Sequence, residues 1–385
     1  MSPTTSSTPP PTTTSSTPSS DPAERLAYLA LALIEGLGPR RIAQLLSCAG
    51  SAERVFANPA LAVGGLRVAP PGLMATLRRP PMQAARDLIE QCATLGYHIL
   101  TPADAEFPAL LRSIPDPPPL LYAAGNLALT NVEAIAIVGS RNHTRYGGEV
   151  AERLGAVAAE AGLVVASGMA RGLDAVAQRA AHTAGGTSIG VLGTGIDIVY
   201  PRENHELFEL VARDGLLLTE YPLGTPPNPG SFPRRNRLIS GLARALVVVE
   251  AAENSGTLIT VSTALEQGRD VLVVPGPINS VNSSGTNRLL RDGAVPILEP
   301  SDILIPYGIV ARPGVITPRP VAAPCTLSPT EARVFAALTA EGQSVDDLAE
   351  LIGIPVGELL AALLGLELGG LVQQLAGAMY RQRQP

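Results

Sequence analysis

The 385-residue sequence predicts an α/β protein whose main domain is a doubly wound, mostly parallel sheet. Short continuous apolar runs alternate with segments of helical period over about 170 residues, and glycine-rich turns follow several of the runs. An apolar run without polar alternation is typical of a strand buried on both faces of a parallel sheet. We expect strands at 135–138, 163–166, 188–192, 216–218, 245–249, 271–274 and 295–298.

The first part of the chain predicts a tail and a helical domain. Residues 1–22 are mainly Ser, Thr and Pro, which bury too little apolar area to offset chain entropy, so we expect a disordered tail. Apolar residues at helical spacing predict an all-helical domain over 23–104, in which a G-x-G hairpin that starts at Gly36 joins two helices. The hairpin is either an ordinary turn or a phosphate site in which Arg40 and Arg41 add charge, and the sequence leaves both open.

The last part of the chain predicts a small domain after the sheet. We expect the sheet domain at 105–306, a Pro-rich linker at 307–325 and a final domain at 326–385. Ser328 has the position of a helix cap, with Pro329 at the first helical position. Three short helices and a hairpin there predict a winged helix. Because this domain has few basic residues and several acids, protein binding and DNA binding are both open roles.

Composition excludes several classes of function. All 28 basic residues are arginine, so neither a Schiff-base lysine nor a Walker A lysine is possible. The three cysteines form no C-x-x-C pair, and we expect no metal and no cofactor. No leader and no apolar run of membrane length is found, so we expect a cytoplasmic protein that contacts no membrane. The net charge of −6 is an average over domains and does not exclude nucleic-acid binding.

Glycine-rich turns follow the expected strands, at the sheet edge where open α/β sheets bind ligands. Glycines let the backbone approach an oxyanion, while hydroxyl groups donate hydrogen bonds and arginines add charge. One such turn is weak evidence, since glycine also permits close packing, but five at one edge indicate an anion site. The turn residues expected to bind phosphate include Gly139, Ser140, Arg141, Arg171, Arg202, Ser255, Gly256 and Thr257. A structural ion pair remains the alternative for Arg141, and pairing with Asp174 remains the alternative for Arg171.

A basic segment, R-R-N-R, begins at Arg234 near an expected helix start. Its charges repel one another and oppose the positive end of the helix dipole unless an anion or an acidic partner compensates. A polyanion is the economical explanation, whereas a solvated basic face would explain Arg234 more readily than Asn236. Aromatic residues beside the expected site are Tyr146, Tyr200, Tyr221 and Phe232. They are too few for a long stacking platform, so backbone contacts should dominate over base contacts.

A series of motifs in a fixed order resembles the DNA-processing protein A family, also called DprA or Smf. Over about residues 105–300 the motifs are V-G-S-R, S-G-M-A-R-G-L-D-A, V-L-G-T-G-I-D-I-V-Y-P-R-E-N, T-E-Y-P-L-G, F-P-R-R-N-R-L-I-S-G-L, E-A-A-E-N-S-G-T-L-I-T, V-P-G-P-I and G-T-N-R-L-L-R-D-G-A. The resemblance implies an extended Rossmann-like domain between a SAM-like helical domain and a winged helix. It further implies a single-stranded-DNA-binding protein of natural transformation, which protects incoming DNA, helps to load the RecA recombinase and forms homodimers through the Rossmann-like domain.

The resemblance also assigns site residues. The family's phosphate contacts carry over to Gly139, Ser140, Arg141 and Arg202. By implication, two further motifs line the same pocket, through Ser167, Gly168, Met169, Arg171, Gly172, Phe232, Arg235, Asn236 and Arg237. One departure from the family pattern is Gln178, where relatives often carry a histidine, so any role of that histidine is in doubt here.

The competing class is an enzyme of the phosphoribohydrolase type, a nucleotide N-glycosidase with a Rossmann-like sheet and a P-G-G-x-G-T-x-x-E turn. In this chain Thr260 stands where that motif needs its carboxylate. The acids Asp174, Asp197, Glu250 and Glu266 form no defined general acid and base pair. We therefore expect a binding protein without catalytic residues.

Overall fold

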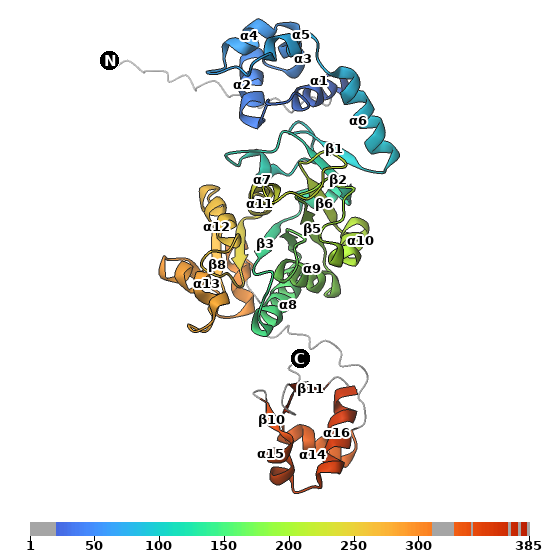
Figure 1. Cartoon of the computed structure of the whole chain (residues 1–385), viewed down its shortest axis with the longest axis vertical. Coiled ribbons are helices and arrows are strands. Elements are labelled where there is room, and N and C mark those ends of the chain that lie inside the picture. The colour runs from blue at the N-terminus through green and yellow to red at the C-terminus, as the bar shows by residue number, and fades with distance from the viewer. Residues whose placement is uncertain (1–20, 310–326, 340–341, 369–370, 376–378, 383–385) are drawn as a thin grey trace, which may run out of the picture. The chain divides into compact units, whose positions relative to one another are not determined.

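The computed structural model describes residues 21–309, 327–339, 342–368, 371–375 and 379–382 (Figure 1). The described residues within Met1–Val310 form one compact unit, and those within Ala311–Pro385 form another. Residues 1–20 of the expected tail and most of the expected linker fall outside this description, and the tail is shorter than expected because a helix already begins at Pro22.

The described part of the first unit begins with helices. These are α1 (Pro22–Ala32), α2 (Pro39–Ala49), α3 (Ala52–Ala57), α4 (Pro59–Gly64), α5 (Leu73–Arg78) and α6 (Met82–Thr94). The expected hairpin joins α1 to α2, with Gly36 at a φ of +76° and the Arg41 Nη1 donating to its carbonyl at 2.8 Å. α1 and α6 also pack on the edge of the sheet, where Leu29 and Cys92 share an apolar cluster with Tyr122.

The sheet contains nine strands in the described residues: β1 (His98–Leu100), β2 (Leu121–Gly125), β3 (Ala134–Val138), β4 (Val164–Ser167), β5 (Ser188–Val191), β6 (Leu216–Thr219), β7 (Ala245–Val248), β8 (Asp270–Val273) and β9 (Val295–Pro296). Their order is β1-β2-β6-β5-β4-β3-β7-β8-β9. The seven strands from β3 to β9 are parallel, and β1 and β2 form an antiparallel edge.

Helices cover both faces of the sheet (Figure 1). Ile135 and Ile137 of β3 pack with α8 (Arg145–Glu160) and α9 (Leu173–Thr183), whereas Ala136 and Val138 pack with α11 (Ser231–Gly241) and α12 (Thr257–Glu266). This alternation along one strand shows that both faces are buried, as its unbroken apolar run predicts. The other helices of this region are α7 (Ala109–Arg112), η1 (Leu127–Asn131), η2 (Arg202–Asn204), α10 (His205–Asp214), α13 (Val281–Arg291) and η3 (Pro300–Tyr307).

The chain builds the parallel sheet outward from β3 in two directions. β4, β5 and β6 are added on one side, and the chain then returns through α11 to add β7, β8 and β9 on the other side. The strand order therefore reverses between β3 and β7, which is the switch point where doubly wound sheets commonly bind ligands.

The predicted fold class is confirmed, and all seven expected strands are present as β3 to β9. The antiparallel edge was not expected, because β1 has three residues and β2 follows a proline-rich stretch without a long apolar run. Since β1 pairs with β2, the sheet begins at His98, ahead of the boundary expected at residue 105.

The second unit has the helices and the sheet of a winged helix. Its elements are α14 (Pro329–Ala337), β10 (Gln343–Ser344), α15 (Val345–Ile352), α16 (Val356–Leu368), β11 (Val372–Leu375) and β12 (Met379–Gln382), with strand order β10-β12-β11. The expected cap of α14 is confirmed, since the Ser328 Oγ accepts from the Glu331 N–H at 3.3 Å.

Within the described ranges, no single helix has both the length and the apolar character of a membrane span. Val345–Ile352 and Val356–Glu367 meet that test only when taken together, and they are bent by 109°.

Candidate functional site

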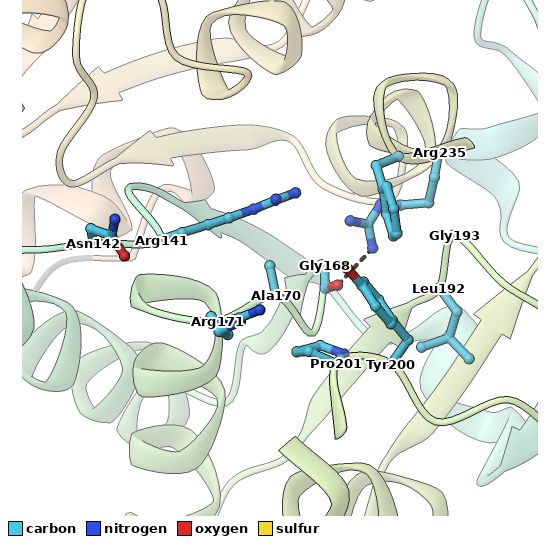
Figure 2. Close-up of a pocket in the computed structure, with 11 residues that line it drawn as sticks. Arg141, Asn142, Gly168, Ala170, Arg171, Leu192, Gly193, Tyr200, Pro201 and Arg235 are labelled. Carbon is cyan, nitrogen blue, oxygen red and sulfur yellow. Dashed lines mark hydrogen bonds between the residues drawn. The ribbon is translucent and has the colours of Figure 1, made fainter. Parts of the chain in front are cut away.

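A pocket opens at the carboxyl ends of β3, β4 and β5, beside the start of α11 (Figure 2). Its volume is about 160 Å³, below the roughly 300–1,000 Å³ of typical small-molecule sites. It is lined by Arg141, Asn142, Gly168, Ala170, Arg171, Leu192, Gly193, Tyr200, Pro201, Phe232 and Arg235. Three of these residues are arginines and none is acidic, so the pocket fits a small anionic group such as a phosphate.

Arg235 reaches the pocket from α11 and is held rigidly. Its Nη1 donates to the carbonyl oxygen of Gly168 at 2.7 Å and also to that of Val191, and its Nε donates to the Asn236 Oδ1 at 3.2 Å. The side chain is buried, and Figure 2 shows it directed at Gly168. These bonds fix the guanidinium in place before any ligand arrives.

Burial and charge perturb the ionisation of this region. The pKa of Arg235 is lowered to about 10, mainly by burial and also by the Arg141 charge, although the Asp174 carboxylate opposes the shift. Burial raises the pKa of Asp174, against the lowering effects of the Arg235 charge and the Gly168 N–H. Arg235 nevertheless stays protonated at neutral pH. Because Arg141 and Arg235 repel each other, an oxyanion in the pocket would relieve this repulsion.

Arg141 extends into the pocket from the turn after β3 (Figure 2). Its guanidinium carbon lies 5.9 Å from the ring centroid of Phe232, and this ring stacks on Tyr200 with 5.3 Å between centroids. No ion pair joins Arg141 to any residue in the described ranges, so the structural ion pair considered from the sequence is not formed there.

Arg171 and Arg202 differ in their positions. Arg171 lines the pocket and pairs with Glu203 at 3.5 Å, not with Asp174, whose Oδ2 accepts from the Gly168 N–H at 3.1 Å. Arg202 is exposed at the start of η2 and does not line the pocket. Arg202 remains a predicted contact for a strand that extends beyond the pocket.

The loop after β4 is shaped by its backbone. Gly172 has a φ of +80°, and a Cβ there would overlap the carbonyl oxygen of Ser140. Met169 has a φ of +56° and a buried side chain that packs against Gly190, so its side chain points away from the pocket. Asn204 holds this loop by donating to the carbonyl oxygen of Met169 at 3.0 Å. Of this loop, Gly168, Ala170 and Arg171 line the pocket, whereas Met169 and Gly172 do not.

The switch point between β3 and β7 is filled by the protein itself. The buried Glu250 carboxylate accepts from the Thr144 N–H at 2.9 Å and from the Thr144 hydroxyl, at the N-terminus of α8. The Thr257 hydroxyl donates to the carbonyl oxygen of Gly139 at 3.3 Å. A carboxylate and a hydroxyl of the chain thus occupy the place where a nucleotide phosphate would bind in many doubly wound sheets.

Several predicted hydroxyl groups are engaged in local bonds. The Ser167 Oγ donates to the carbonyl oxygen of Ile137 at 2.6 Å, and the Ser140 Oγ accepts from the Asn142 N–H at 3.2 Å. The Ser255 Oγ contacts the Thr257 Oγ1 at 3.0 Å, beside the exposed Gly256. None of these residues with a hydroxyl group lines the pocket, so the structure does not bring them together with Arg235.

Arg237 is a structural residue in this fold. It is buried and pairs with Glu220 at 2.6 Å and with Asp116 at 3.1 Å, and Arg234 also pairs with Glu220 at 3.4 Å. Acidic partners within the chain therefore compensate these two arginines, so their charges do not by themselves require a polyanion, and a contact of Arg237 with DNA stays a prediction. Asn236 does not line the pocket and serves Arg235 through its side-chain oxygen.

Five lining residues were not predicted as site residues, namely Asn142, Ala170, Leu192, Gly193 and Pro201. Asn142 and Leu192 illustrate the reason. Asn142 follows Arg141 directly, and Leu192 precedes the glycine turn after β5. Both positions could have been found from the same rule, since the residues beside a turn at the carboxyl end of a strand share its location.

Gln178, the departure from the family pattern, is fully buried between α9 and β5. Its Nε2 donates to the carbonyl oxygen of Ile189 at 3.3 Å, and its Oε1 has no partner among the described residues. His182 lies nearby, with its Nε2 at 3.0 Å from the Ser188 Oγ. Neither side chain lines the pocket.

Comparison with known proteins decides the family. A family model described as DNA recombination-mediator protein A matches residues 98–308. The chain belongs to this family. The model of the DprA winged helix domain matches residues 318–378, which include the second compact unit's first helices.

Relatives from three bacteria illustrate the similarity within the family. Protein Smf of Escherichia coli is 39% identical over 297 residues, which cover 74% of this chain and 78% of that protein. The X-ray structure of DNA processing protein A from Streptococcus pneumoniae has a TM-score of 0.63 at 31% identity, covering 73% of this chain and 96% of that one. A structure of DNA processing protein A from Helicobacter pylori, described for its single-stranded DNA binding mode, has a TM-score of 0.51 at 30% identity and covers 55% and 95%.

Proposed function

We propose that this protein binds single-stranded DNA and seats a backbone phosphate in the pocket over β3, β4 and β5. One observation carries the proposal: Arg141 and Arg235 meet at a pocket that no acidic residue lines. A phosphate accepts bidentate hydrogen bonds from a guanidinium and cancels the repulsion between the two charges. The family's Helicobacter pylori member, which is described as binding single-stranded DNA, supports the choice of ligand.

The aromatic pair beside the pocket suits an unpaired nucleotide. Tyr200 is 38% exposed and stacks on Phe232, whose ring is also covered by Arg141. A base that follows the bound phosphate can stack on the exposed face of Tyr200, which duplex DNA does not allow. Stacking accepts any base, so the binding is expected to be largely independent of sequence.

The wider role proposed is that of a mediator in natural transformation. We infer that the protein protects incoming single-stranded DNA and helps to load the RecA recombinase, in line with the family model's description as a recombination mediator. We also propose a homodimer formed through the sheet domain. The exposed apolar side chains of Ile259 and Leu265 on α12 support an interface there.

We propose a division into a helical domain, the sheet domain and a winged helix, in which the sheet domain starts at His98.

The phosphoribohydrolase alternative is not favoured. Thr260, which stands where that motif needs a carboxylate, is buried in α12, and no acid lines the pocket. We propose binding without turnover, and incubation with nucleoside monophosphates should release no free base.

The test of the function is a titration of a labelled single-stranded oligonucleotide by fluorescence anisotropy. Replacing Arg141 by Ala should lower affinity roughly fivefold at physiological salt, because the variant neutralises one phosphate fewer. The matched control is Arg153→Ala, an exposed arginine on α8 outside the pocket, which should bind like the wild type. Equal affinities of the wild type and Arg141→Ala would refute the proposed site.

A further inference from the structure

The segment from α2 to the start of α6 carries a local excess of positive charge. Residues 40–86 contain seven arginines and one acidic residue, Glu53, a net charge of +6. The whole chain carries −6, so the remaining residues together carry −12. The charge of the whole chain therefore hides a strongly basic region, which is the usual electrostatic footprint of a nucleic-acid surface.

Most of these arginine side chains form no hydrogen bond or ion pair that would stabilise the fold. Six have exposed side chains, and no hydrogen bond or ion pair joins any of these six side chains to another residue of the described ranges. They are Arg40, Arg54, Arg67, Arg78, Arg79 and Arg86. In the sheet region, the exposed side chains of Arg171 and Arg213 pair with carboxylates, whereas those of Arg153 and Arg202 form no ion pair with a described residue. An exposed and unpaired set of this size is available to an anionic partner from outside the chain.

The helices α2 to α5 share one small core with α1. Leu45, Val55 and Leu77 are buried together in it, so the arginines from Arg40 to Arg79 lie on the outer surface of one bundle, and Arg86 follows on α6. A bundle of about 50 residues has a radius of gyration of roughly 10 Å. This is close to the Debye length of about 8 Å at physiological ionic strength, so the fields of neighbouring arginines overlap.

The same segment offers nothing for unpaired bases to stack on. Its one aromatic residue, Phe56, packs against the core of the bundle. Proteins that hold single strands combine basic charge with aromatic stacking, whereas duplex DNA keeps its bases inside and presents one phosphate charge per about 1.7 Å of axis. Charge without aromatics therefore fits a duplex backbone.

We propose that helices α2 to α5 and the start of α6 form a second binding surface, for double-stranded DNA. The surface contacts backbone phosphates through its exposed arginines and reads no base sequence. This function goes beyond the single-strand pocket and does not depend on it. With both sites, one molecule can hold the single-stranded and the duplex parts of one DNA substrate.

The experiment uses the full chain and the triple variant Arg67→Ala, Arg78→Ala and Arg79→Ala. Anisotropy titrations compare a blunt-ended duplex with an oligothymidylate of equal length at several salt concentrations. We expect the variant to bind duplex at least about tenfold more weakly, with a salt slope smaller by about 0.9 for each phosphate that it no longer neutralises. Its single-strand affinity should stay within about twofold of the wild type.

The matched control replaces the same three residues by lysine. Lysine keeps the charge and neutralises a phosphate as a point charge, so duplex affinity should be largely retained. The surface is refuted if the alanine variant binds duplex like the wild type, or if the lysine variant binds duplex as weakly as the alanine variant. Arg141→Ala gives the converse result and separates the two proposals, because it should weaken single-strand binding and spare duplex binding.

Discussion

Two neighbouring regions of the sheet edge are alike in sequence and different in structure. Over β3 to β5, glycine turns and Arg141 and Arg235 leave an open pocket. Between β3 and β7, similar turns are closed by the Glu250 carboxylate and the Thr257 hydroxyl. A glycine turn is therefore open to an external anion only where no side chain of the chain already occupies the place.

The same contrast occurs within α11, between two arginines that are two positions apart. Arg235 bonds to backbone carbonyls and keeps a face toward the pocket, whereas Arg237 pairs with Glu220 and Asp116. Successive helix positions point in different directions, so nearby arginines of one motif reach different partners. One basic motif therefore holds both a residue that lines the pocket and a residue that is held by ion pairs within the chain.

The contrast between Arg235 and Arg237 predicts its largest loss of stability for Arg237→Ala. The substitution removes the buried partner of Glu220, whose side chain is 4% exposed, and leaves that carboxylate only its ion pair with the exposed Arg234. The free energy of unfolding should fall by up to about 3–5 kcal/mol, because an exposed arginine compensates a buried charge weakly. Chemical denaturation measures this decrease. Arg234→Ala is the control, because its side chain is 56% exposed and its ion pair is worth at most about 1 kcal/mol. A folded Arg237→Ala protein with weakened single-strand binding would show that Arg237 belongs to the site after all.

A medium effect is expected for Glu250→Ala at the switch point. The substitution removes the acceptor of the Thr144 N–H and hydroxyl, and should lower the free energy of unfolding by about 1–3 kcal/mol. Single-strand affinity should not change. The control is Glu253→Ala, an exposed neighbour that pairs with Arg288 at 3.5 Å. If Glu250→Ala alters single-strand affinity without a decrease in stability, the switch point takes part in binding.

The smallest effect is expected for Thr257→Val, which keeps the shape of the side chain and removes its hydroxyl. Removing one bond to the Gly139 carbonyl should lower the free energy of unfolding by roughly 0.5–1.5 kcal/mol, measured by chemical denaturation. Because Thr257 does not line the pocket, the affinity for single-stranded DNA should equal that of the wild type. A clear drop in that affinity would restore Thr257 to the predicted phosphate site.

The parallel part of the fold could be predicted because each buried strand is an unbroken apolar run. The antiparallel edge could not, since β1 is three residues long and is defined only by its pairing with β2. A strand of that length has no pattern of its own. Tertiary pairing, which a single sequence does not display, decides whether it forms.

The site could be predicted in part for the same kind of reason. The location of Arg141 and Gly168 follows from the rule that turns at the carboxyl ends of parallel strands meet at one edge. The role of Arg237 depends on Asp116, which is 121 positions away in the chain and belongs to a loop without a motif. Local sequence shows where a side chain starts, but not which distant carboxylate it meets.

The central claim is that Arg141 and the pocket over β3 to β5 neutralise a phosphate of single-stranded DNA. The most direct measurement is the slope of log affinity against log salt for an oligothymidylate, in the wild type and in Arg141→Ala. The claim predicts a slope smaller by about 0.7 in the variant, with an unchanged free energy of unfolding. Equal slopes in the two proteins would contradict it.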